Sequence, residues 1–154
     1  MVYYSHTSTL TSTMNFHNPA PAEICSLLRE VRVIAVVGLS PNPARPSYGV
    51  ACALQCAGYR IVPVRPMTES VLGEPAYPDL GSVPIPIDIV DVFRAPQHVP
   101  AIVESCIKLG IKHLWLQDGV IHEAAALRAQ QAGIQVVMDR CMWRDYSQLC
   151  KDQR

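Results

Sequence analysis

The sequence lacks the features that would assign it to several common functional classes. No apolar stretch approaches the roughly 18–20 residues needed to cross a bilayer, so a membrane partner is not expected. Neither sign of charge is in excess, because 13 Lys and Arg residues are balanced by 13 Asp and Glu residues. Without a basic field, a nucleic-acid partner is not expected either. The remaining composition, 49% hydrophobic and 17% charged over 154 positions, is that of one compact globular domain.

The six cysteines include no Cys-x-x-Cys pair, the spacing typical of zinc sites and redox motifs. Cys52 and Cys56 are spaced as one turn of a helix, and Cys25 and Cys106 fall in amphipathic helical patterns. This usage is typical of reduced thiols in the cytoplasm. We therefore predict a cytoplasmic protein with neither a disulfide framework nor a metal site.

The N-terminal segment is distinct from the rest of the chain. Residues 1–18 contain no acidic residue, no Lys and no Arg, and they have no apolar middle segment. A transit peptide would need Arg, and a secretory signal would need an apolar stretch. We expect residues 1–18 to be a disordered or poorly ordered tail and residues 19–154 to form the domain.

Strand and helix patterns alternate along this domain. The expected strands are, in order, 33–37, 59–64, 87–93, 113–116 and 134–138, with a further short strand near 76–77. The expected helices are 19–28, 47–57, 99–109 and 120–132. Such alternation predicts an α/β fold. We expect a single Rossmann-like domain, with a mostly parallel sheet of about five strands and helices on both faces.

Ligands of such sheets bind beyond the carboxyl ends of the strands, where the strand order reverses. The candidate site residues therefore follow each strand. They are Gly38-Leu39-Ser40, Arg65-Pro66, Phe93-Arg94, Gln117-Asp118-Gly119 and Asp139-Arg140-Cys141.

The loop after the first strand has the chemistry of an anion site. Gly38 lets the backbone approach a phosphate closely, and Ser40 adds a hydroxyl donor. The loop is not Gly-x-Gly-x-x-Gly, and its three prolines contribute no amide donors. Arg45, Ser47 and the first turn of the following helix would therefore carry more of the binding. A plain strand-to-helix turn is the competing interpretation.

The second strand ends in Arg65, where an NAD site usually has Asp or Glu to accept a bond from the ribose. A cation there suits a phosphorylated ribose, as in NADP or coenzyme A, although a solvated surface arginine fits equally well. Arg94 lies where a pyrophosphate or its adjoining arm would pass, unless it binds a loop carbonyl. Gln117 and Gly119 would line the ligand groove or form a close-packed turn.

No catalytic constellation is visible in the sequence. Ser40 has no candidate histidine at a neighbouring strand end. Asp88 and Asp91 are three apart in one strand, so they face opposite sides, and Asp118 has no evident partner. Whether the protein is an enzyme stays open, with a binding protein favoured.

Cys141 is the one reactive side chain expected at the ligand edge. Its neighbour Arg140 would favour the thiolate, which could exchange disulfides with a ligand thiol. An inert, buried cysteine is the competing interpretation.

Taken together, the strand-end segments resemble the stand-alone CoA-binding domain proteins, which are related to the N-terminal domain of the succinyl-CoA synthetase alpha subunit. The matching segments are Val36-Val37-Gly38-Leu39-Ser40, Arg45-Pro46-Ser47-Tyr48-Gly49-Val50, Gly58-Tyr59, Val62-Pro63-Val64-Arg65-Pro66, Asp88-Ile89-Val90-Asp91-Val92-Phe93-Arg94, Leu114-Trp115-Leu116-Gln117-Asp118-Gly119 and Asp139-Arg140-Cys141-Met142. The match runs from about residue 24 to 149, nearly the whole chain beyond the tail. One departure is Arg65, where the family commonly has the Asn of Val-Asn-Pro.

The resemblance implies a protein that binds CoA or an acyl-CoA without catalysis of its own. The implied cofactor-binding residues are Gly38, Leu39, Ser40, Arg45, Ser47, Tyr48, Arg65, Pro66, Phe93, Arg94, Gln117 and Gly119. The alternatives are an NADP-linked oxidoreductase and a redox-responsive protein that forms a CoA mixed disulfide at Cys141. The expected partner is a small nucleotide ligand, and a homodimer stays open.

Overall fold

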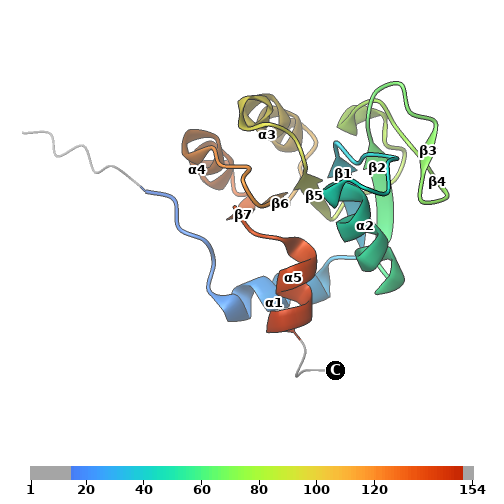
Figure 1. Ribbon diagram of the computed structural model, residues 1–154. Coiled ribbons are helices and arrows are strands. Elements are labelled where there is room, and N and C mark those ends of the chain that lie inside the picture. Colours follow the sequence, from blue (N-terminus) through green and yellow to red (C-terminus); the bar gives the residue numbers. More distant parts are fainter. Residues whose placement is uncertain (1–14, 151–154) are drawn as a thin grey trace, which may run out of the picture.

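A computed structural model describes residues 15–150 of the chain (Figure 1). Its centre is a five-stranded sheet in the order β2-β1-β5-β6-β7, in which every pair of neighbours is parallel. The strands are β1 (Val33–Val37), β2 (Arg60–Val64), β5 (Ile89–Val92), β6 (His113–Leu116) and β7 (Gln135–Met138). A separate antiparallel pair is formed by β3 (Ser70–Val71) and β4 (Glu74–Pro75). The predicted α/β fold with a five-stranded Rossmann-like sheet is confirmed.

Helices cover both faces of the sheet, with α3 and α4 above it and α1 and α5 below it in Figure 1. The helices are α1 (Pro21–Glu30), α2 (Pro46–Cys56), α3 (Val99–Lys108), α4 (Glu123–Gln131) and α5 (Met142–Leu149), with short 3-10 turns at Leu80–Ser82 and Pro96–His98. Two apolar cores result. One packs α1, α2 and α5 against the sheet, and the other packs α3 and α4 against the opposite face.

Two local features differ from the expectations. The strand expected near 76–77 is a single bridge between Val64 and Tyr77, and the hairpin beside it uses β3 and β4 instead. The C-terminal helix α5 was not predicted at all. Pro63 lies inside β2, which is tolerated because β2 is an edge strand of the five-stranded sheet.

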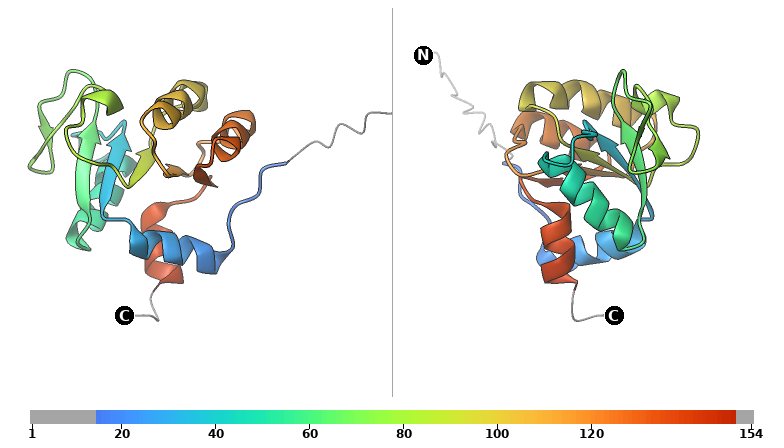
Figure 2. Two further views of the ribbon diagram at one scale, coloured as in Figure 1. Left: turned by 180° about the vertical axis from the view of Figure 1, so that it is seen from behind. Right: turned by 45° about the vertical axis from the view of Figure 1, so that its right-hand side comes forward.

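Cys25 in α1 and Cys150 after α5 form a disulfide across 125 residues of sequence. The prediction that the cysteines are all reduced is therefore wrong for this pair. The two residues meet because α1 and α5 lie side by side, as both views of Figure 2 show. The free cysteines of the described residues are Cys52, Cys56, Cys106 and Cys141.

Residues 1–14 of the expected tail lie outside the described residues, but its last residues pack onto the domain. The Phe16 amide donates to the Glu123 carboxylate (2.9 Å). Asn18 exchanges two hydrogen bonds with the Met138 backbone, at 2.9 and 2.8 Å, and so covers the outer edge of β7. Phe16 and Asn18, which the sequence analysis assigned to the tail, thus contact the domain. Within residues 15–150, no helix has the length and apolar character required to cross a membrane.

Candidate functional site

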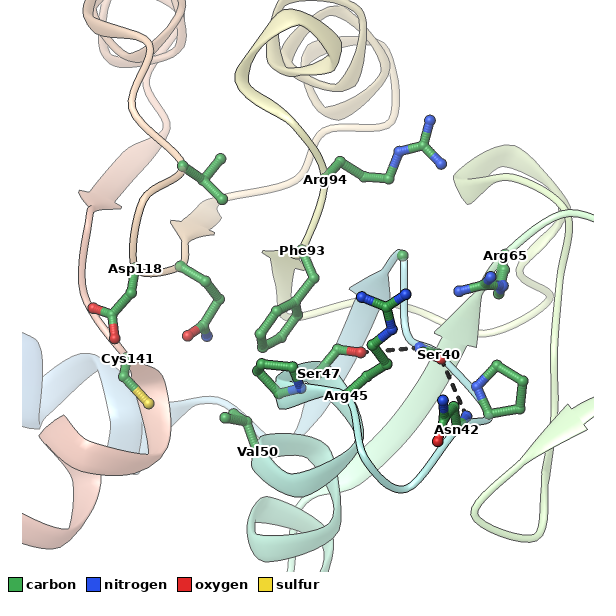
Figure 3. Close-up of a pocket in the computed structure, with 15 residues that line it drawn as sticks. Ser40, Asn42, Arg45, Ser47, Val50, Arg65, Phe93, Arg94, Asp118 and Cys141 are labelled. Atoms are coloured by element: carbon green, nitrogen blue, oxygen red, sulfur yellow. Dashed lines mark hydrogen bonds between the residues drawn. The ribbon is translucent and has the colours of Figure 1, made fainter.

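The strand order reverses between β1 and β5, which lie next to each other in the sheet. The chain leaves β1 through α2 on one face and leaves β5 through α3 on the other face. This order places the ligand crevice of a doubly wound sheet at the carboxyl ends of β1 and β5. A cavity of about 950 Å³ lies there (Figure 3).

Most of the site residues predicted from the sequence line this large cavity. They are Gly38, Ser40, Arg45, Ser47, Arg65, Phe93, Arg94 and Gln117. Asp118 and Cys141, which the sequence also placed at strand ends, line it too, and the structure adds Pro41, Asn42, Pro46, Val50 and Val120. Of these, Asn42 lies between two prolines of the first loop. A polar residue at such a position is the one sequence signal that could have identified Asn42 as a site residue.

Four of the twelve residues implied to bind the cofactor do not line the large cavity. Leu39 is fully buried in the core under α2, and Tyr48 packs against the same core. Pro66 lines a smaller cavity. The Gly119 amide donates to the Asp139 carboxylate (2.8 Å), so that donor is already used.

The first loop uses its own amides to hold its shape. The Ser40 amide donates to Ser47 Oγ (3.0 Å), and the Asn42 amide donates to Ser40 Oγ (3.1 Å). The Ala44 amide in turn donates to Asn42 Oδ1 (3.0 Å). These bonds leave fewer backbone donors for a diphosphate than a glycine-rich loop has. An anion here would therefore be bound by side chains and by the N-terminus of α2. The N-cap residue of this helix, Arg45, makes no side-chain hydrogen bond to its first turn.

Three arginines contribute the positive charge of the cavity. Arg45 begins α2, Arg65 follows β2, and Arg94 follows β5. Among the described residues, none of the three takes part in an ion pair. Figure 3 shows Arg45 and Arg65 on the same side of the cavity as Ser40 and Asn42. Unpaired arginines that converge on one cavity with a helix N-terminus are suited to phosphate groups.

The opposite side of the cavity is close to neutral. Asp118 accepts two hydrogen bonds from Arg144, at 2.8 and 2.9 Å, and these bonds hold the pKa of the carboxyl below its usual value. The expectation that Asp118 has no partner is therefore wrong. Cys141 lies beside Asp118 in Figure 3. Arg140, which the sequence offered as the cation for the Cys141 thiolate, instead binds the buried Asp145 at 2.5 and 2.9 Å.

A buried carboxyl lies behind the cavity wall. Asp91 in β5 is fully buried, and its Oδ1 accepts a hydrogen bond from Gln117 Nε2 (2.7 Å). Burial raises the pKa of Asp91 to about 7, against the lowering effect of this bond and of the Val92 backbone. Asp88 instead accepts bonds from the Arg32 and Val33 amides at 2.9 Å, so the two carboxyls are not paired.

Comparison with known proteins assigns a family. The family model described as a CoA binding domain matches residues 32–147. The chain belongs to this family. It is 40% identical over 125 residues to the uncharacterized protein YneT of Bacillus subtilis (strain 168), covering 81% of this chain and 93% of that protein. A solved structure, a hypothetical protein from Pyrococcus horikoshii OT3, superimposes with a TM-score of 0.82 at 36% identity, covering 85% of this chain and 92% of the other.

A larger relative of this CoA-binding domain is acetate–CoA ligase [ADP-forming] I of Archaeoglobus fulgidus. The two are 23% identical over 121 residues, which covers 72% of this chain and only 18% of the ligase. The family resemblance expected from the strand-end segments is thus confirmed.

The smaller cavity of this CoA-binding domain adjoins the large one. It measures about 250 Å³, and it shares Gly38 and Arg94 with the large cavity. Its other walls include Pro66 and Leu80, with His98 and Ser105 from the far side. Pro66 therefore lines the smaller cavity and not the large one.

Proposed function

We propose that this CoA-binding domain protein binds CoA or an acyl-CoA at the carboxyl edge of its sheet, without catalysis of its own. The observation that carries the proposal is the convergence of Arg45, Arg65 and Arg94 on one cavity at the strand-order reversal. CoA carries a diphosphate and a ribose phosphate, so it presents several anionic groups to these cations. The name of the A. fulgidus relative, a CoA ligase, supports this ligand class.

The two sides of the cavity suggest an orientation for the ligand. The phosphates belong at the side of Ser40, Arg45 and Arg65, where the unpaired cations lie. The uncharged pantetheine arm belongs at the side of Val120 and Cys141, where Asp118 is neutralised by Arg144. No residue that lines the large cavity, among those described, is a histidine that could activate the Ser40 hydroxyl. We therefore assign the cavity to binding.

Arg65 supplies the test of this ligand. If Arg65 binds the 3′-phosphate, CoA should bind about 10- to 150-fold more tightly than dephospho-CoA, since a charge-assisted hydrogen bond contributes roughly 1.5–3 kcal/mol. Arg65→Ala should remove most of that difference. Arg60→Ala is the matched control, because Arg60 is exposed at the opposite end of the same strand. Isothermal titration calorimetry of both ligands with the three proteins measures these affinities.

The possible results separate the parts of the proposal. Equal affinities for CoA and dephospho-CoA would show that Arg65 does not bind the 3′-phosphate. Failure of the wild-type protein to bind CoA, together with fluorescence enhancement of NADPH on titration, would replace CoA by NADP as the ligand.

Cys141 gives a second candidate function, a redox-responsive protein, because it lines the cavity at the side assigned to the thiol-bearing arm. Its thiolate would attack oxidised CoA, forming a protein–CoA disulfide and releasing one CoA thiolate. Intact-mass spectrometry after incubation with oxidised CoA should then show one CoA adduct, and the adduct should be absent from Cys141→Ser. If the adduct persists in this variant, another cysteine has reacted with oxidised CoA. Cys56→Ser, which removes an exposed free cysteine, is the control for that outcome.

A further inference from the structure

The pair formed by Asp91 and Gln117 has no role in the phosphate contacts described above. Asp91 lies in the middle of the sheet, where its neighbours in register are Val36 of β1 and Trp115 of β6. A carboxyl at such a position is costly to bury, and an apolar residue would pack there more favourably. Asp91 Oδ2 has no hydrogen-bond partner among the described residues, so the carboxyl is not retained for a complete internal network.

The hydrogen bond to Asp91 determines which way the Gln117 amide faces. Gln117 Nε2 donates to Asp91 Oδ1, which turns the amide nitrogen into the protein. Within residues 15–150, Gln117 Oε1 takes part in no hydrogen bond. It is also not fully buried, unlike Asp91 Oδ2 and His113 Nδ1, the two buried polar atoms of these residues that have no partner. Gln117 is only 3% exposed and lines the large cavity, so its amide oxygen, which is left without a partner, is the amide atom available to that cavity.

We propose that Asp91 is a positioning residue that holds the Gln117 oxygen toward the cavity, so that the site selects a ligand with an N–H or O–H donor at this point. An ionised phosphate has only acceptor oxygens and would not satisfy Gln117. The amide N–H groups and the hydroxyl of the pantetheine arm would satisfy it. The inference rests on the proposed function, and it assigns Gln117 to the arm and not to the nucleotide.

The position of Gln117 agrees with this assignment. It follows β6, and its backbone amide continues the pairing of that strand by donating to the Val92 carbonyl (3.3 Å). The next residue, Asp118, lies across the cavity from Arg65 (Figure 3). Gln117 is thus followed directly by a residue on the side of the cavity assigned to the arm.

The experiment compares CoA with 3′-phospho-ADP, the fragment of CoA that lacks the pantetheine arm. Gln117→Met keeps the length of the side chain but removes the acceptor. We expect it to weaken CoA binding by about 3- to 10-fold, the range for one neutral hydrogen bond, and to leave the affinity for 3′-phospho-ADP unchanged. Gln130→Met, at an exposed position of α4, is the matched control and should change neither affinity.

Asp91 is tested through its dependence on Gln117. Asp91→Val should weaken CoA binding to a similar extent, and the double variant with Gln117→Met should bind CoA no more weakly than Gln117→Met alone. Independent, multiplying effects of the two substitutions would overturn the positioning role. If Asp91→Val does not fold, Asp91→Asn replaces it. Its amide can also donate to Gln117 Oε1 and turn the Gln117 amide round, so CoA binding should weaken at least twofold.

The remaining outcomes separate this inference from the proposed function. If the wild-type protein binds neither CoA nor 3′-phospho-ADP, the proposed function is wrong and the inference falls with it. If it binds both ligands, and Gln117→Met binds CoA as tightly as the wild type, only the inference is overturned. Equal weakening of both ligands would place Gln117 against the nucleotide and would also overturn it.

Discussion

Gly38→Ala is expected to lower the free energy of unfolding by about 3 kcal/mol or more, because two separate costs add at this position. Gly38 has a φ of +85°, where a residue with a side chain is strained. A Cβ atom added there would also lie 2.5 Å from the Phe93 carbonyl oxygen and 3.0 Å from Arg94 Cδ. The first of these atoms belongs to the backbone, which continues the β1–β5 pairing through a 2.9 Å bond from the Phe93 amide to the Val37 carbonyl. It cannot move without disturbing that pairing.

Two other glycines provide matched controls for this substitution. Gly119 also has a positive φ (+78°), but no atom lies within 4 Å of an added Cβ, so Gly119→Ala should cost only the backbone strain of about 1 kcal/mol. Gly49 lies within α2 with a helical backbone and open space, so Gly49→Ala should stabilise the protein by about 0.5–1 kcal/mol. Urea denaturation of the three variants measures these differences. A Gly38→Ala variant as stable as Gly119→Ala would contradict the rigid contact with Phe93.

The requirement for glycine at residue 38 was predictable from the sequence, and so was the fold around it. An apolar run followed by Gly38 and a proline-rich loop predicts a buried strand that ends in a turn, and β1 has the expected bounds. Gly58, Gly110 and Gly133 similarly mark where helices stop, and all three have positive φ. These signals are local, because backbone conformation at a strand end or helix end depends on only a few adjacent residues.

The pairings between distant side chains were not predictable in this way. Asp118 and Arg144 are 26 residues apart, as are Asp91 and Gln117, and Cys25 and Cys150 are 125 apart. Each contact depends on how elements pack, and no spacing in the sequence encodes it. The one sequence signal for this pair is that Asp91 is a charged residue within the otherwise apolar β5. This signal indicates an unusual residue but does not identify Gln117 as its partner.

The α5 helix shows the same limit at the level of secondary structure. Of its eight residues, only Met142 and the charged Asp145 are buried, and the Asp145 carboxylate is held by Arg140 outside the helix. Met142, Tyr146 and Leu149, spaced as one face of a helix, contact the same core as α1 and α2, but eight residues are too few for a helix to be stable without such contacts. The neutral side of the cavity depends on this helix, since it carries Arg144. Sequence patterns located residues on both sides of the cavity, whereas the ion pair that neutralises Asp118 required the structure.

Asp91→Asn is expected to make the protein more stable at pH 8 than the wild type, by up to about 4 kcal/mol. The Asp91 carboxyl has an ordinary pKa of 3.8, and burial raises it to about 7 in the folded protein. The folded state therefore holds this proton more tightly than the unfolded state does. Between about pH 4 and pH 7 the free energy of unfolding falls as the pH rises, and above the folded pKa the loss is complete. Asparagine does not ionise, so the variant avoids this loss, and its side chain can hydrogen-bond to Gln117 in either orientation of the Gln117 amide.

The measurement is the difference in free energy of unfolding between Asp91→Asn and the wild type, from urea denaturation at several values between pH 5 and 8.5. The difference should grow in favour of the variant up to about pH 7 and then level off. Asp88→Asn, the same change at a carboxylate that accepts two backbone bonds, should not reproduce this trend. A difference that stays constant with pH would show that Asp91 does not titrate within the folded protein. The expected trend would instead show that the protein loses stability at neutral pH by retaining this carboxyl.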